Sequence, residues 1–210
     1  MKTLAKISAA FVLVGLTSSS VVYAQDEQSN ANYVQFGISD SNLQLTADAD
    51  DAAGFNLAAR YYLTDKVFLR GNYDRLSAND TLVAPGGELV DFDLNYDFAQ
   101  FGASYIFAET DQLDFYSIFQ AEYLGIDASI NNGRVTDEDE WGFSAGLGAK
   151  ALLWDVLDLS LEANYVDIEG ETWRVNAAAS YRITESFSLG LATQTWDEFD
   201  VVSITAQYRF

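Results

Sequence analysis

The chain of 210 residues has no cysteine and no histidine, and it contains a single proline. Without cysteine there is no disulfide framework, no thiolate metal site and no thiol nucleophile. Without histidine, the chain lacks the side chain that most often serves as a general base beside serine or aspartate. Proline removes a donor from a strand ladder, so its scarcity suits a chain made almost wholly of paired strands. Pro85 lies in a Gly-containing stretch and marks a loop.

Basic residues are also scarce, with 11 Lys and Arg against 32 Asp and Glu, for a formal net charge of −21. A nucleic-acid partner is excluded, because phosphate binding needs clustered Lys and Arg. We interpret the excess acid as a solubilising, repulsive surface. The acidic runs at 48–51 and 137–140 could attract divalent cations diffusely. Counting from Asp48, the sixth residue is Ala53 rather than the glycine of an EF-hand loop, so no metal site and no cofactor are predicted.

The first 24 residues have the pattern of a secretory signal peptide. Lys2 and Lys6 give a positive start, residues 7–16 are apolar, and residues 22–24 end on alanine where a signal peptidase cuts. The apolar run is much shorter than the roughly 20 residues of a membrane-spanning helix. We therefore predict export into the periplasm, with a signal peptide at 1–24 and one domain at 25–210.

The last eleven residues alternate strictly between apolar and polar side chains. Val202, Ile204, Ala206, Tyr208 and Phe210 share one parity, and Ser203, Thr205, Gln207 and Arg209 share the other. The same period of two recurs from about Tyr33 onward, and charged residues keep to the parity opposite the aromatics. Lipid outside and a polar interior would require this pattern. It predicts an all-β, transmembrane, antiparallel up-and-down barrel of ten strands, with eight strands as the alternative.

We expect strands at about 33–39, 53–63, 66–75, 91–107, 113–125, 140–153, 156–167, 172–183, 187–196 and 200–210. Tight connections at 64–65, 108–112, 154–155 and 184–186 alternate with mostly longer, acidic ones at 40–52, 76–90, 126–139, 168–171 and 197–199. Short periplasmic turns and longer outer loops are typical of such barrels.

The fourth strand contains an irregularity, since Phe92, Leu94, Tyr96 and Phe98 have the opposite parity to Phe101, Ala103, Tyr105 and Phe107. We expect a β-bulge near residues 99–100 to restore the register. The first half of this strand, with Asp91 and Asp93, is then expected to project above the membrane.

Charged residues on the inward parity are the candidate site residues. The lumen-lining candidates are Arg60, Arg70, Asp74, Asp114, Glu122, Lys150, Asp158, Glu162, Arg174, Arg182 and Arg209, with Asp91, Asp93 and Asp97 on the same polar parity. A buried charge is costly unless it is paired, and a barrel of this size leaves little free space inside. We therefore expect a salt-bridged polar interior rather than a conduction path. The alternative interpretation of the basic residues near the periplasmic ends is a gate or selectivity filter that faces Asp114 and Asp158.

No catalytic site is predicted, and the protein is not expected to be an enzyme. Glu122 with Asp74 or Glu162 could form a carboxylate pair of the kind used in acid–base catalysis. A role as polar lining is favoured for all three.

The segments at 58–70 and 206–210, together with the signal peptide, resemble the small Gram-negative outer-membrane barrels, the opacity-protein and porin-like group related to OmpX and the membrane domain of OmpA. The resemblance implies contact with outer-membrane lipid and escort by periplasmic chaperones. It also implies that the barrel-assembly machinery recognises Tyr208 and Phe210. Members of this group serve in adhesion, serum resistance, envelope stability and weak pore formation.

Three functions are compatible with the sequence. The leading one is an integral outer-membrane barrel with acidic extracellular loops, a structural or surface-interaction role and a polar, largely plugged lumen. The second is a narrow pore that prefers cations. The third is a soluble periplasmic barrel that turns its apolar parity inward and binds an apolar ligand.

Overall fold

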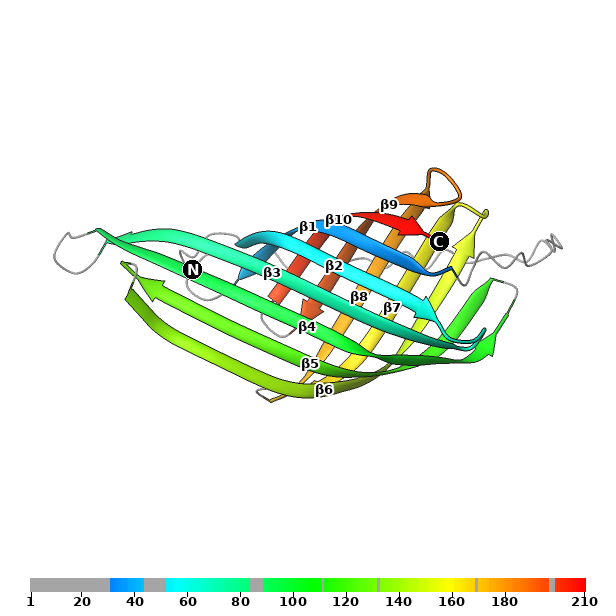
Figure 1. Cartoon of the computed structure of the whole chain (residues 1–210), viewed down its shortest axis with the longest axis horizontal. Helices are drawn as coiled ribbons and strands as arrows, with labels where there is room; N and C mark the ends of the chain where they lie inside the picture. Colours follow the sequence, from blue (N-terminus) through cyan, green and yellow to red (C-terminus); the bar gives the residue numbers. More distant parts are fainter. Residues whose placement is uncertain are drawn as a thin grey trace, which may run out of the picture.

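The computed structural model describes residues 31–43, 52–83, 89–110, 112–131, 133–168, 170–196 and 199–210. They form one closed antiparallel barrel in which each strand pairs with the next and the first pairs with the last (Figure 1). The strands are β1 (Tyr33–Leu43), β2 (Ala52–Tyr62), β3 (Val67–Val83), β4 (Leu89–Glu109), β5 (Leu113–Ile130), β6 (Gly133–Leu153), β7 (Leu157–Asp167), β8 (Glu171–Arg182), β9 (Phe187–Trp196) and β10 (Phe199–Arg209). The predicted fold class and the count of ten strands are confirmed. The predicted signal peptide lies outside the described residues.

Four tight turns close one end of the barrel, as predicted, between β2 and β3, β4 and β5, β6 and β7, and β8 and β9. Trp154 and Asp155 both have positive φ, at 52° and 58°, which is the backbone of a type I′ hairpin turn. The carboxyl end of the chain lies at this end too, where the Phe210 amide donates to the Asn32 carbonyl at 3.1 Å. No described helix is long and apolar enough to cross a membrane.

Four consecutive strands form a wall that is taller than the rest of the barrel. β3, β4, β5 and β6 have 17, 21, 18 and 21 residues, whereas the other strands have 10 to 12. In Figure 1 they run beyond the other strands at the end opposite the tight turns. The long loops predicted at 76–90 and 126–139 were therefore wrong over most of their length. The strands continue because their alternation continues, and Ala78 still faces Leu94 across the ladder.

Within the part of the barrel that all ten strands share, the apolar parity faces outward. On β10, Ile204 is 61% exposed whereas its neighbours Ser203 and Thr205 are 6% and 5% exposed. Outward aromatics gather near both ends of the band, as membrane interfaces require; they include Tyr61, Tyr105 and Tyr181 near the turns and Trp141 and Trp173 near the far end. The hypothesis of a soluble barrel with its apolar parity inward was wrong.

The predicted bulge at residues 99–100 was wrong as well. β4 keeps an unbroken register with β3 through Gln100 and Phe98, and the register shift lies between Ile106 and Ala108 instead. The even-numbered residues thus face inward along most of the strand, and Asp91, Asp93 and Asp97 lie on the outward face rather than in the lumen. Above the bilayer the outward face of β4 is in contact with water. There the outward residues are polar and the inward residues are apolar, although the register of the strand does not change.

Candidate functional site in the barrel lumen

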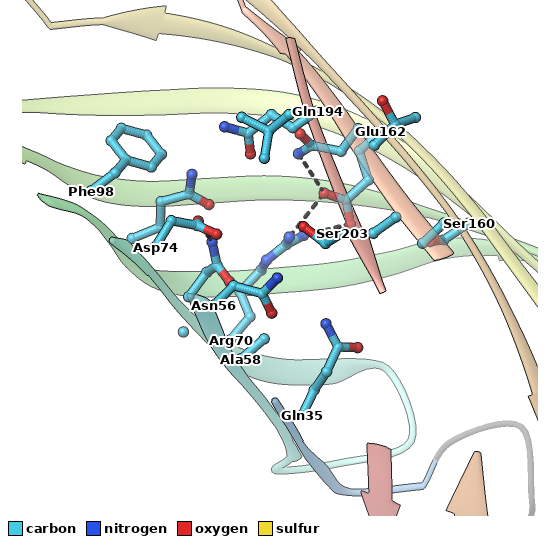
Figure 2. Close-up of a pocket in the computed structure, with 18 of the residues that line it drawn as sticks. Gln35, Asn56, Ala58, Arg70, Asp74, Phe98, Ser160, Glu162, Gln194 and Ser203 are labelled. Atoms are coloured by element: carbon cyan, nitrogen blue, oxygen red, sulfur yellow. Dashed lines mark hydrogen bonds and ion pairs between the residues drawn. The ribbon is translucent and has the colours of Figure 1, made fainter. Parts of the chain in front are cut away.

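An ion pair crosses the lumen between β3 and β7, which are four positions apart around the ring of ten strands. Arg70 donates two parallel hydrogen bonds to the two carboxylate oxygens of Glu162, at 2.7 and 2.8 Å (Figure 2). Tyr116 donates a third to Glu162 at 2.7 Å, from β5. Bidentate geometry fixes the orientation of both side chains, so the pair forms a rigid strut across the lumen.

A second ion pair joins β5 to β8 and is fully buried. Arg174 donates to the two carboxylate oxygens of Glu122 at 2.6 and 3.1 Å, and both side chains are 0% exposed. Gln120 and Ser144 also donate to the same carboxylate. These neutral donors add hydrogen bonds to the buried carboxylate. A buried ion pair needs such additional hydrogen bonds if its desolvation cost is to be offset.

Two further clusters lie near the tight turns. Lys150 pairs with Asp114 at 3.2 Å and donates to the hydroxyl of Tyr62 at 2.7 Å. Arg182 and Arg209 share Asp158, and the Arg182 contact is 3.1 Å. Of the five basic residues predicted near the periplasmic ends, Lys150, Arg182 and Arg209 therefore lie beside Asp114 and Asp158 and are neutralised by them. Arg70 pairs with Glu162 instead, and Arg60 pairs with neither aspartate.

All eleven lumen-lining candidates lie on the inward parity, and nine of them are in these ion pairs. With Asp91, Asp93 and Asp97 outside, the candidates comprise six bases and five acids. Glu122 and Glu162 each pair with their own arginine, so the structure brings together no carboxylate pair of the kind considered from the sequence.

Arg60 and Asp74 form no salt bridge with a described residue. The guanidinium of Arg60 stacks over the rings of Tyr33 and Phe68, at 5.3 and 4.6 Å from their centroids. Asp74 accepts a hydrogen bond from Asn72, its neighbour along the same face of β3.

A cavity of about 180 Å³ lies in the lumen, with Asp74 and the Arg70–Glu162 pair in its wall (Figure 2). Arg60 also lines it. Three amide atoms in its wall are buried without a hydrogen-bond partner among the described residues: Asn56 Oδ1, Gln100 Nε2 and Asn176 Oδ1. Unsatisfied buried polar atoms are uncommon, so each calls for an explanation such as a bound molecule.

The outer end of the lumen is filled by buried apolar side chains, here called the apolar layer. Phe98 on β4 and Trp196 on β9 come from opposite walls, five positions apart around the ring, and their ring centroids are 5.1 Å apart. The layer consists of Ala52, Leu76, Leu94, Tyr96, Phe98, Leu124, Val166, Ile168, Trp196 and Val201. Sequence reasoning missed this layer, although its signal was the alternation of Leu94, Tyr96 and Phe98 with polar residues.

The remaining sequence-predicted sites lie elsewhere. The run at 137–140 is part of β6 rather than a loop, and the described residues contain no group of three or more acids arranged to hold a metal ion. The run at 48–51 lies outside the described residues. Tyr208 and Phe210 both point outward, and their rings are stacked with centroids 6.5 Å apart.

A closed antiparallel barrel with an apolar outer band and an ion-paired interior is a transmembrane barrel of the outer-membrane type. The family described as outer membrane protein beta-barrel domain matches residues 9–210, and the chain belongs to this family. The protein accordingly lies in the outer membrane.

Several solved structures are similar to this chain. The translocator domain of the autotransporter NalP from Neisseria meningitidis is 14% identical with a TM-score of 0.51, over 88% of this chain and 90% of that chain. Ail of Yersinia pestis, in complex with the heparin analogue sucrose octasulfate, is 14% identical with a TM-score of 0.44, over 86% and 97%. An outer membrane channel from Pseudomonas putida F1 is 10% identical with a TM-score of 0.47, over 86% and 96%. A comparison with curated proteins finds no significant match.

Proposed function

We propose that this barrel has a structural and surface-interaction role, with an acidic outer wall as its interaction surface and a lumen that is closed to ions. The observation that carries the proposal is the exchange of chemistry on the tall wall. Its outward face above the aromatic band is acidic on β4, β5 and β6, whereas the inward faces of β4 and β5 are apolar.

The acids on this outward face come from three adjacent strands. Asp97 pairs with Arg75 at 3.6 Å, and Asp139 accepts a hydrogen bond from Tyr123 at 2.7 Å. The outward acids of the tall wall are Asp91, Asp93, Asp97, Asp127, Asp137 and Asp139. A surface with so much charge of one sign attracts and orients basic partners and repels acidic ones.

The tall wall also has a free edge. Residues 133–142 of β6 pair with β5, but they have no described strand partner on the side of β7, whose ladder begins at Phe143. Unpaired strand edges can accept an extended peptide, and charged side chains on them discourage self-association. A basic, extended segment is the partner that fits both properties.

Binding to intact cells tests the surface role, because only the outer face is accessible there. The probe is a fluorescent lysine-rich peptide, and the variant combines D91N, D127N and D137N. The matched control removes three acids from the opposite end, with D65N, D155N and E185Q. The outer variant should bind the peptide several-fold more weakly, and the control should bind normally. Equal binding by both variants would contradict the proposal.

Two kinds of barrier that follow one another along the lumen, ion pairs and apolar side chains, support the proposal that the lumen is closed to ions. Arg70–Glu162 and Arg174–Glu122 cross or line the interior, and the apolar layer fills the outer end. Barrels of about eight strands have interiors just filled by side chains, whereas aqueous channels appear at about sixteen.

Planar-bilayer recordings with the purified protein test closure. The wild type should give no steps above background, and the F98A/W196A/R70A variant should give discrete steps. Discrete cation-preferring steps from the wild type would instead establish the second function, a narrow cation-preferring pore.

We also propose that the chain reaches the membrane by the usual export route. The segment at 1–24 would direct export, chaperones would hold the chain in the periplasm, and the barrel-assembly machinery would recognise Tyr208 and Phe210. The outward direction of both aromatic rings supports this, because it leaves them accessible on the outside of the closing strand.

A further inference from the structure

We propose that the cavity beneath the apolar layer binds a small amphipathic cation, a primary ammonium that carries one apolar group. Asp74 would hold the ammonium, and the apolar layer would cover the apolar group. The inference concerns the lumen and stands apart from the proposed surface role.

The charge of Asp74 selects the sign of the ligand. Asp74 is the one lumen-lining acid that lacks a salt bridge within the described part of the chain. The guanidinium groups of Arg70 and Arg174 are held by Glu162 and Glu122 at 2.7 and 2.6 Å. Because a carboxylate withdrawn from bulk water is costly without a counter-ion, the site favours a cation.

Unpartnered carbonyl oxygens in the cavity wall select an ammonium with N–H groups. Asn56 is the register partner of Asp74 across β2 and β3, and it is 5% exposed. Its amide nitrogen donates to Ser39 at 3.1 Å, which leaves Oδ1 as an unpartnered acceptor in the cavity wall. Asn176 Oδ1 is a second such acceptor from β8. A primary ammonium has three donors and no acceptor, so it matches one carboxylate and two carbonyl oxygens.

Arg60, the basic residue of the cavity wall that forms no salt bridge with a described residue, lies at some distance from Asp74. Arg60 is the register partner of Arg70, and Asp74 is four residues further along β3. At about 3.3 Å per strand residue, the backbones are separated by roughly 13 Å. The aromatic rings of Tyr33 and Phe68 already contact the Arg60 guanidinium.

The outer end of the cavity selects an apolar group. Six members of the apolar layer line it: Leu76, Tyr96, Phe98, Leu124, Trp196 and Val201. A volume of about 180 Å³ is below the roughly 300–1,000 Å³ of pockets for drug-sized ligands. The apolar group is therefore a single ring or a short chain.

Trp196 provides a local reporter for the test. It is buried at the cavity, whereas Trp141, Trp154 and Trp173 are all strongly exposed outside the lumen. The full barrel with W141F, W154F and W173F, folded in phospholipid nanodiscs, is titrated with 2-phenylethylammonium. Two matched probes of similar shape are 2-phenylethanol, which is neutral, and 3-phenylpropionate, which is an anion.

The ammonium should change Trp196 emission saturably. The alcohol should bind at least about tenfold more weakly, because charge-assisted hydrogen bonds are roughly twice as strong as neutral ones. The carboxylate should bind at least as weakly as the alcohol, because it has the same sign of charge as Asp74. D74N should weaken ammonium binding to a similar extent, and D139N, which removes an acid from the outer face, should leave it unchanged. The proposal is overturned by an absent or unsaturable response, by equal binding of the three probes, or by unchanged binding in D74N. The comparison of the three probes needs no lumen variant, so it decides the matter even where D74N fails to fold.

Discussion

The buried pair of Arg174 and Glu122 allows a quantitative test of how the lumen is held together. In the R174M variant, the Glu122 carboxylate would keep its hydrogen bonds from Gln120 and Ser144, but at 0% exposure it would lose its only ion-pair partner among the described residues. Breaking a buried pair on one side typically costs about 3–5 kcal/mol, because the remaining charge is uncompensated. We expect R174M to lower the free energy of unfolding by about this amount.

The exposed pair of Arg75 and Asp97 is the matched control. Its side chains are 46% and 28% exposed and 3.6 Å apart, so R75M should cost less than about 1 kcal/mol. The double variant E122Q/R174M should recover most of the loss, since a neutral amide can still bond to Gln120 and Ser144. Urea titration of the protein folded in phospholipid vesicles, followed by electrophoretic mobility, measures all three. If R174M and R75M cost the same, the buried pair does not hold the lumen as argued.

Three other predictions concern the barrel wall. G102A should lower the free energy of unfolding by about 1–3 kcal/mol in the same urea titration, because its Cβ would lie 2.0 Å from the Phe119 carbonyl oxygen. G71A is the control and should unfold like the wild type, because the nearest atom to its Cβ would be 3.7 Å away. A spin label at Ile204 should be relaxed by lipid-dissolved oxygen and one at Ser203 should not, and the reverse result would invert the assignment of the two faces. F210S should reduce the folded fraction in cells but not refolding in vesicles. W154S, which removes another exposed aromatic near the same end, should affect neither. If F210S reduced refolding in vesicles as much as it reduced folding in cells, Phe210 would act through stability alone.

The sequence allowed the ten strands, their tight turns and the lipid-facing parity to be predicted, because each depends on local alternation. It did not reveal the height of the tall wall. Residues 76–83 and 126–130 lack the apolar outward face that marks a membrane strand, so they resembled loops. Outside the bilayer, however, period-two alternation persists while the apolar side turns inward, and Phe98 and Leu124 belong to this inner face.

The pairing of lumen charges was predictable only between neighbouring strands. Asp114 and Lys150 are register partners on β5 and β6, so their contact follows from the hairpin alone. Arg70 and Glu162 are 92 residues apart on strands that do not pair. Their contact depends on the bore and on the tilt of the strands, which are properties of the closed barrel rather than of any single segment. The apolar contact of Phe98 with Trp196 has the same origin.

The acidic outer wall and Asp74 attract the same sign of charge, and the apolar layer lies between them. A small hydrated cation at the acidic surface would lose its hydration on entering the apolar layer. This desolvation costs free energy, because the layer offers the ion no polar partner. A cation with an apolar group loses less by crossing it. Beyond Asp74, the guanidinium of Arg60, which forms no salt bridge with a described residue, repels further movement of positive charge toward the tight turns. The same lumen can therefore be closed to ion flow and still hold an amphipathic cation, so absent conductance and saturable ammonium binding are compatible outcomes.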